Sequence, residues 1–292
     1  MTVKKILGIG ALTSAILLGA CSNDNESADD QSFAEQVDYN VIGVEPGAGL
    51  TGLAETTLES YDNLKDWDLK ISSTAGMLGS LDKAISNEEP IVITGWTPHW
   101  MFSAYDLKIL DDPKGTLGAE ENIQTLARQG LQSDLPHAYE VLDRFNWQAE
   151  DMEQVMLDGQ SMEYVEAAQK WIDENSDRVA QWTEGIPQSN GEEINLITTQ
   201  WDSELASTTV VQLVLQSLGY KVTTTPVDPA IMFEAIANGD GDATVAPWLP
   251  TTHAAFYEKH KDSIVDLGPN LTGTKNGFVV PSYVEIDSID EL

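Results

Sequence analysis

The chain has 292 residues, which is enough for two lobes that each bury a core. Its formal net charge is −33, because it carries 48 Asp and Glu residues but only 15 Lys and Arg residues. Nucleic acids and bare anionic membrane surfaces are therefore excluded as partners, since both attract clustered Lys and Arg. The acidic residues are spread along the whole chain and predict a charged, well-solvated surface.

The first 20 residues have the pattern of a signal peptide, in which two lysines precede an apolar run. This run, residues 6–18, is shorter than a membrane span needs to be. It leads into Leu-Gly-Ala-Cys at 18–21, which resembles a bacterial lipobox, and Cys21 is the only cysteine in the chain. We therefore expect cleavage before Cys21, a lipid on Cys21 that anchors the protein to the cell membrane, and no disulfide. The alternative is an ordinary signal peptide followed by a chance cysteine.

Residues 21–38 are rich in Asn, Asp, Glu, Ser and Gln and contain few apolar side chains. Such a segment cannot bury enough surface to fold, so it predicts a flexible tether. The folded part of the protein is thus expected to lie outside the cytoplasm, within reach of the membrane.

The first folded segment alternates between strand and helix patterns. Short apolar runs predict strands at 41–44, 67–72 and 91–94, and helical spacing of apolar residues predicts helices at 50–61 and 75–86. A β-α-β-α-β order favours a parallel sheet with a ligand at the carboxyl ends of its strands.

The same order returns in the second half of the chain. Strands are predicted at 194–199, 221–225 and 243–246, with helices at 205–218 and 229–237 between them. The sequence therefore predicts two similar α/β lobes.

The region between the halves, residues 118–186, has helical spacing throughout. This region contains Trp147, Trp171 and Trp182. We expect these tryptophans to pack between helices, and ligand contact is the less favoured alternative. Two further strands are predicted near the end of the chain, at 263–266 and 277–281.

Three tryptophans follow predicted strands: Trp96, Trp201 and Trp248. Two of them, Trp96 and Trp248, begin Trp-x-Pro motifs that lie 152 residues apart, which indicates a duplicated lobe. The same offset pairs Trp201 with a glycine turn at Gly49. The faces of several indoles suit a quaternary ammonium group, which is large and weakly hydrated. Indoles buried in the two cores are the alternative.

Residues 47–52 match G-x-G-x-x-G before a predicted helix. We reject a dinucleotide site, because the next strand lacks an acidic residue for the ribose and an exported protein has no ready supply of NAD. Backbone N–H groups at a helix N-terminus still favour an anion, with a plain tight turn as the alternative. His253, five residues after Trp248, could donate a further hydrogen bond to a carboxylate. Together these features suit a zwitterion with a methylated ammonium at one end.

No motif predicts a cofactor, a metal site or catalysis. The acidic turn at 238–242 lacks the glycine that a calcium loop needs at its sixth position, where Ala243 stands. The histidines lack zinc-ligand spacing, and no nucleophile paired with a base is recognisable. We therefore expect a binding protein rather than an enzyme.

With these features the sequence resembles the glycine betaine-binding lipoproteins of ABC importers, the OpuAC type. The resemblance covers essentially the whole chain, and its most specific part is Gly-Trp-Thr-Pro-His-Trp-Met-Phe at 95–102. Other matching segments are residues 18–21, 43–49, 110–114, 201–204, 248–253 and 277–281.

The resemblance implies an α/β, two-lobed periplasmic-binding-protein fold of type II that closes on its ligand. It implies an aromatic prism around the trimethylammonium group, formed by Trp96, Trp201 and Trp248. The ligand carboxylate would be held by the backbone N–H groups of Gly49 and Leu50 and by the side chain of His253. Family members often carry Ile at the position of Leu50, a change that a backbone donor tolerates.

We also expect from the resemblance a monomer that delivers its ligand to a membrane permease with a cytoplasmic ATPase. Lobe I is placed at 39–108 plus 268–292, and lobe II at 109–267. Glycine betaine is the expected ligand, with proline betaine as a second. Carnitine or choline is the nearest alternative, and a secreted carbohydrate-active lipoprotein is the alternative from another class.

Overall fold

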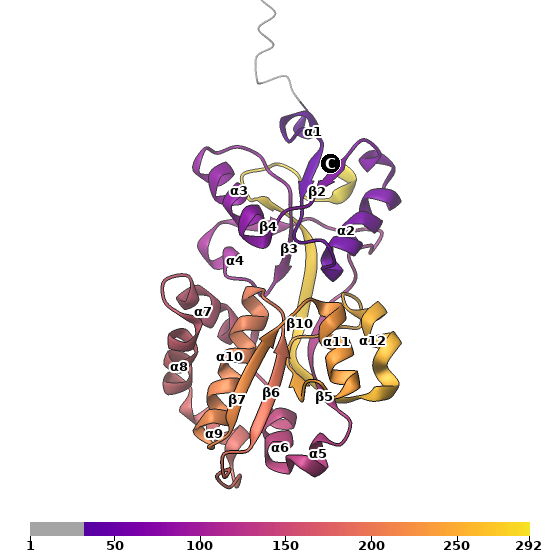
Figure 1. Ribbon diagram of the computed structural model, residues 1–292. Helices are drawn as coiled ribbons and strands as arrows, with labels where there is room; N and C mark the ends of the chain where they lie inside the picture. The colour runs from indigo at the N-terminus through magenta and orange to yellow at the C-terminus, as the bar shows by residue number, and fades with distance from the viewer. Residues whose placement is uncertain (1–31) are drawn as a thin grey trace, which may run out of the picture. The chain divides into compact units, whose positions relative to one another are not determined.

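One long strand, β10 (Ile264–Pro281), connects two regions of sheet in the computed structural model, which describes residues 32–292. Its first part pairs antiparallel with β5 (Glu121–Arg128). Its second part pairs antiparallel with β3 (Ile93–Thr97) and β4 (Leu107–Ile109). Figure 1 shows β10 passing from one region to the other, and we call the region around β3 lobe I and the region around β5 lobe II.

Lobe I is a short parallel sheet with a helix after each of its first two strands. Strand β1 (Asn40–Ile42) lies between β2 (Asp68–Lys70) and β3. Helices α2 (Gly49–Ser60) and α3 (Thr74–Ser86) connect these strands and bury apolar side chains in the core. The shorter elements of this lobe are α1 (Phe33–Gln36), α4 (Met101–Ala104) and the 3₁₀ turns η2 (Asp62–Leu64) and η4 (Ile289–Glu291).

Lobe II repeats the parallel arrangement. Strand β6 (Glu193–Thr198) pairs parallel with β7 (Lys221–Pro226) and β8 (Ala243–Thr244). Helix α10 (Asp202–Ser217) follows β6 and is deeply buried. The remaining elements after β7 are α11 (Pro229–Asn238), β9 (Trp248–Leu249), α12 (Ala254–His260) and the 3₁₀ turn η3 (Lys261–Ser263).

A group of helices covers the outer side of lobe II: α5 (Leu131–Asp134), α6 (Pro136–Arg144), α7 (Ala149–Gly159), α8 (Tyr164–Glu174) and α9 (Ser176–Thr183). Three tryptophans, Trp147, Trp171 and Trp182, are each 2% exposed and pack together there. The Trp147 and Trp171 ring centroids lie 5.6 Å apart, and those of Trp171 and Trp182 lie 6.0 Å apart. The predicted packing role of these three residues is confirmed.

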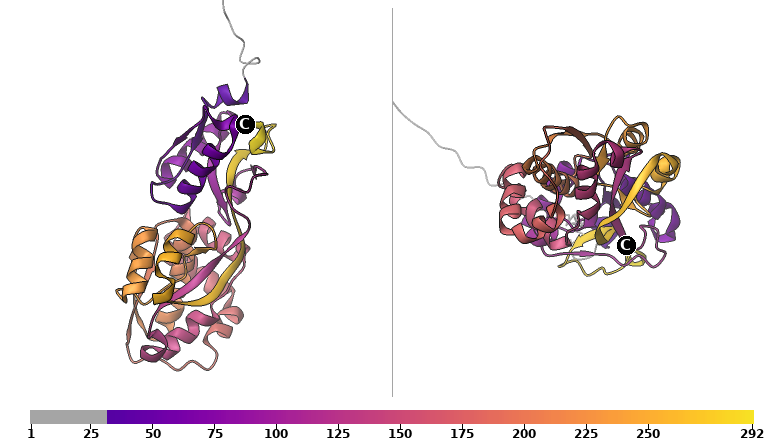
Figure 2. Two further views of the ribbon diagram at one scale, coloured as in Figure 1. Left: turned by 90° about the vertical axis from the view of Figure 1, so that its right-hand side faces the viewer. Right: turned by 90° about the horizontal axis from the view of Figure 1, so that it is seen from below.

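The α/β fold is as predicted, but the sheet is mixed. Its parallel pairs lie within each lobe, and antiparallel pairing joins β10 to β3, β4 and β5. The side view in Figure 2 shows β5 and β10 running side by side along one edge of the molecule. This pair of strands is the connection on which the two lobes are arranged.

Three sequence-based expectations about this connection were wrong. Helical spacing was expected throughout residues 118–186, yet β5 lies there, and alternate residues of its first half are buried. The two strands expected at 263–266 and 277–281 are one continuous strand. Strand β3 does not end before Trp96 but continues to Thr97, ahead of a cis peptide bond to Pro98.

Two predicted segment boundaries do not coincide with features of the structure. Phe33–Gln36 of the expected tether is helical, because Phe33, Ala34 and Val37 supply apolar side chains that pack on the core. Strand β10 pairs with β5 up to Thr274 and with β3 from Lys275 onward. This change of partner does not coincide with the predicted lobe boundary at residue 268. As lobe boundaries, the ranges given above remain a prediction. The signal peptide and Cys21 lie outside the described residues.

Within residues 32–292, no helix combines the length and the apolar character that a membrane crossing requires.

Candidate ligand-binding pocket

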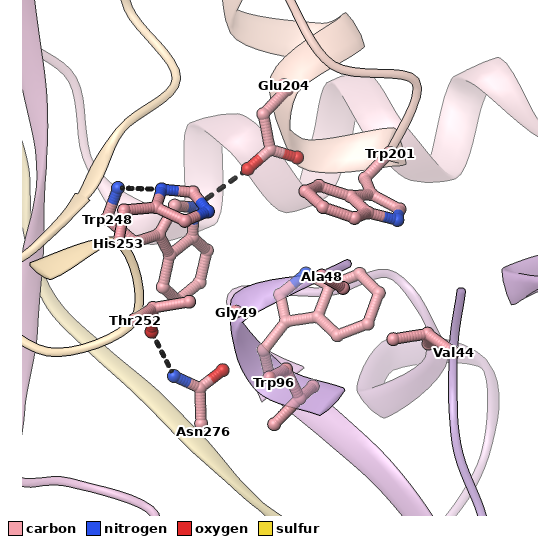
Figure 3. Close-up of a pocket in the computed structure, with 11 residues that line it drawn as sticks. Val44, Ala48, Gly49, Trp96, Trp201, Glu204, Trp248, Thr252, His253 and Asn276 are labelled. Carbon is pink, nitrogen blue, oxygen red and sulfur yellow. Dashed lines mark hydrogen bonds between the residues drawn. The ribbon is translucent and has the colours of Figure 1, made fainter. Parts of the chain in front are cut away.

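A pocket lies where the two lobes meet, and it encloses about 340 Å³, including the open space at its mouth. All six residues that the sequence predicts for the ligand site line it: Gly49, Leu50, Trp96, Trp201, Trp248 and His253. Five further residues line it as well: Val44, Ala48, Glu204, Thr252 and Asn276. Figure 3 shows these side chains arriving from both lobes. The structure thus brings the predicted residues together, while their role in binding stays a prediction.

Three indoles form the aromatic part of the pocket. Trp96 stands on β3 and is 6% exposed, whereas Trp248 stands on β9 and is 4% exposed. Trp201 is the residue before α10 and is half-buried. Its indole N–H donates to Glu45 Oε2 of lobe I at 3.1 Å. This arrangement presents aromatic rings from three separate segments to one small space (Figure 3).

The start of α2 also lines the pocket. Gly49 and Leu50 are the first two residues of this helix, and the first N–H groups of a helix have no partner inside it. A Cβ atom at Gly49 would lie 2.2 Å from the carbonyl oxygen of Thr252 in lobe II. Glycine is therefore required here by the close approach of two backbones, rather than by its φ angle.

His253 is a buried, neutral imidazole whose Nε2 can donate a hydrogen bond. The side chain is 1% exposed, and its Nδ1 accepts the backbone N–H of Trp248 at 3.0 Å. Because Nδ1 is the acceptor, the proton of the neutral ring is on Nε2. Burial lowers the pKa of His253 to about 4, so the ring stays uncharged near neutral pH. A carboxylate beside Nε2 would receive a hydrogen bond from it.

A buried carboxylate, Glu204, also lines the pocket. It is 3% exposed, and its Oε1 accepts the indole N–H of Trp248 at 2.8 Å. Its Oε2 accepts the Ser203 hydroxyl at 2.7 Å. Burial raises the pKa of Glu204 to about 7, although these two hydrogen bonds act to lower it.

A second buried carboxylate, Glu121 on β5, organises the turn that carries His253. It accepts the backbone N–H groups of Thr251 and Thr252, each at 3.0 Å, and the Thr252 hydroxyl. It also accepts the side-chain amide of Asn276 on β10 at 2.9 Å. The pocket is therefore supported from the strand pair that joins the lobes.

Asp202 connects the lobes at the edge of the pocket. Its carboxylate accepts the Trp100 indole N–H of lobe I at 2.8 Å and the Tyr164 hydroxyl of lobe II at 2.7 Å. His99 Nε2 lies 3.6 Å from the same carboxylate. Burial acts to raise the pKa of Asp202, but the contacts with His99, Tyr164 and Trp100 outweigh it and lower the pKa. Trp100 thus contacts Asp202 and does not line the pocket itself.

Sequence reasoning missed Glu204 and Glu121 as parts of the site. Both are acidic residues in a chain with 48 of them, so nothing in composition separates them from surface carboxylates. The one available signal for Glu204 was its place in the first turn of a helix directly after Trp201. Among residues 32–292, no group of His, Cys, Asp and Glu side chains is suited to hold a metal ion.

Comparison with known proteins gives concordant results. Residues 23–174 and 192–292 match the family described as the substrate binding domain of ABC-type glycine betaine transport system. The chain is 44% identical to the glycine betaine/carnitine transport binding protein GbuC of Listeria monocytogenes, over 99% of this chain and 98% of that protein. It is similar to the crystal structure of lactococcal OpuAC in its closed-liganded conformation with glycine betaine, with 51% sequence identity and a TM-score of 0.50. That superposition covers 53% of this chain and 61% of the lactococcal one.

Proposed function

The chain belongs to the substrate-binding domains of ABC-type glycine betaine transport systems, and from this membership we propose that it captures glycine betaine outside the cytoplasm for uptake. The two similar proteins described above bear names that include glycine betaine. The chemistry of the pocket supports the same ligand.

The observation that carries this proposal is the polarity of the pocket. The three indoles suit a trimethylammonium group, which has no N–H to satisfy and is attracted by aromatic faces. The start of α2 and the neutral His253 donor suit a carboxylate. Glycine betaine carries both groups, one carbon apart. A single small molecule can therefore satisfy both ends of the pocket.

Binding would also hold the two lobes together. Gly49, Leu50 and Trp96 belong to lobe I, and Trp201, Trp248 and His253 belong to lobe II. A ligand that contacts both lobes stabilises the closed arrangement over any open one. A membrane permease with a cytoplasmic ATPase would recognise the closed, loaded protein. Lipid on Cys21 would keep this monomer at the outer face of the membrane.

Other quaternary ammonium compounds differ from glycine betaine in whether they carry a carboxylate and in how far it lies from the ammonium group. Carnitine, which appears in the name of the Listeria protein, has both charged groups but a longer chain between them. Choline would leave His253 and the α2 N-terminus without an anion. A carbohydrate is disfavoured, because the lining around the indole rings is mainly apolar and offers few groups to bind sugar hydroxyls.

Calorimetric titration of the purified chain with glycine betaine, carnitine, choline and maltose tests the proposal. We expect the tightest binding with glycine betaine, weaker binding with choline and none with maltose. Absence of heat with glycine betaine would refute the proposed function, and tight binding of maltose would favour the carbohydrate alternative.

A further inference from the structure

The proposed function gives no role to Glu204, although this carboxylate lines the pocket. Its Oε1 accepts the indole N–H of Trp248, and its Oε2 accepts the hydroxyl of Ser203. Both oxygens thus face donors, which is the pattern of an ionised carboxylate. The close-up in Figure 3 shows the Glu204 side chain above the indoles of Trp201 and Trp248.

Burial of the Glu204 carboxylate does not by itself stabilise the folded protein. Within residues 32–292, no Lys or Arg forms an ion pair with Glu204, and a buried charge without a counter-charge costs free energy. Its neighbour Asp202 adds a second negative charge nearby. A neutral acceptor such as Gln would satisfy Trp248 just as well. The negative charge therefore needs a partner that is not part of the chain.

We propose that Glu204 is the charge-selecting residue of the pocket: its carboxylate orients the Trp248 indole through Nε1 and supplies the negative charge that pairs with the quaternary ammonium of the ligand. This inference rests on the proposed function, in which that ammonium lies among the indoles. Aromatic faces alone distinguish a cation from a neutral group of the same shape only moderately. A buried carboxylate adds a Coulomb term that acts over several ångströms in a poorly solvated site.

Among the titratable groups around the pocket, Glu204 is the one whose charge changes near neutral pH. Burial raises its pKa to about 7. Asp202, on the same helix, has a lowered pKa and stays ionised, whereas Tyr164 of α8 has a raised pKa and stays neutral. His253, before α12, has a pKa of about 4. A bound cation favours the ionised form of Glu204, so binding below pH 7 would release a proton.

The variant Glu204→Gln separates charge from position. The amide oxygen can still accept the Trp248 N–H, and the amide nitrogen can donate to Ser203, so the indole keeps its orientation. Two probes of matching shape are glycine betaine and 3,3-dimethylbutanoate, in which a neutral carbon replaces the ammonium nitrogen. We expect Glu204→Gln to weaken glycine betaine binding by at least about tenfold and to leave 3,3-dimethylbutanoate binding unchanged or stronger.

Each outcome of calorimetry on the full chain decides the inference. An equal loss for both probes would mean that Glu204 only positions Trp248, and an unchanged glycine betaine affinity would mean that its charge is irrelevant; either result overturns the inference while the proposed function stands. Failure of the unmodified chain to bind glycine betaine would instead refute the proposed function. Glu153→Gln, on helix α7, removes one carboxylate that does not line the pocket and should leave both affinities unchanged.

The pH profile of the unmodified chain gives a test that needs no variant to fold. Glycine betaine affinity should rise with pH up to about 7, the pKa of Glu204, and level off above it. The ligand itself does not titrate in this range, because its ammonium carries no proton and its carboxylate is ionised. Affinity that is flat between pH 5 and 8 would overturn the inference.

Discussion

The two lobes use the same junction, a strand followed by a helix, for opposite purposes. In lobe I the turn after β1 ends in Ala48, and α2 begins at Gly49 with backbone N–H groups that have no partner inside the helix. In lobe II the turn after β6 ends in Trp201, and α10 begins beside an indole. The first junction suits an anion and the second suits a cation. Under the proposed function, this difference in residue type between equivalent turns would give the fold a site for a zwitterion.

The second pair of junctions did not diverge in this way. Trp96 and Trp248 both begin Trp-x-Pro turns, and the peptide bonds Thr97–Pro98 and Leu249–Pro250 are both cis. Both indoles are nearly buried. The comparison therefore predicts that changes at Gly49 affect the anion end alone, whereas changes at the tryptophans affect the cation end.

The largest effect is expected for Gly49→Ala. The added methyl group would lie 2.2 Å from the Thr252 carbonyl oxygen, so the α2 N-terminus and the His253 turn must move apart. A displacement of this kind should weaken glycine betaine binding on the order of 100-fold in calorimetry. Gly52→Ala, three residues further along the same helix, is the matched control, because nothing lies within 4 Å of a Cβ there. If both variants bind alike, the close approach at Gly49 has no functional meaning.

Removal of one indole comes next. Trp248→Ala should weaken glycine betaine binding by well over tenfold, since a desolvated cation–π contact contributes about 2 kcal/mol. The measurement is the same titration, with thermal unfolding as a check, because the indole is 4% exposed and also supports the fold. Trp248→Phe keeps an aromatic face but loses the N–H to Glu204, so an intermediate affinity is expected. An unchanged affinity for Trp248→Ala would remove this residue from the cation end.

Stability in acid should reveal the neutral state of His253. Its pKa is lowered from 6.5 to about 4 by burial, so the unfolded chain takes up a proton at a higher pH than the folded chain does. The stability that His253 contributes is therefore complete above pH 6.5 and is lost as the pH falls towards 4. Thermal unfolding of His253→Gln should show a smaller loss of Tm over this range than the unmodified chain. Parallel curves would contradict a buried, neutral His253.

The smallest effect is expected at the contact between the lobes beside the pocket. Trp100→Phe removes the indole donor to Asp202, which lies at 2.8 Å. Loss of one such hydrogen bond should weaken glycine betaine binding by about fivefold, with little preference between charged and neutral ligands. A loss confined to glycine betaine and absent for 3,3-dimethylbutanoate would show that Trp100 contacts the ammonium group instead.

Much of the lining of the candidate pocket could be predicted because its residues lie in short local motifs. Trp-x-Pro turns, a glycine turn before a helix and the spacing from Trp248 to His253 are all visible in the sequence. Glu204 was not predictable, because its burial depends on an indole that is 44 residues away along the chain. Strand β5 was missed because its partner, β10, comes from the far end of the chain. Long-range contacts, and not local patterns, determine both features.

A structure of the chain bound to glycine betaine would be the decisive measurement for the proposed binding mode. We predict that the trimethylammonium group lies among Trp96, Trp201 and Trp248, with the carboxylate at the N–H groups of Gly49 and Leu50. The reverse orientation, or a ligand seated outside this pocket, would contradict it.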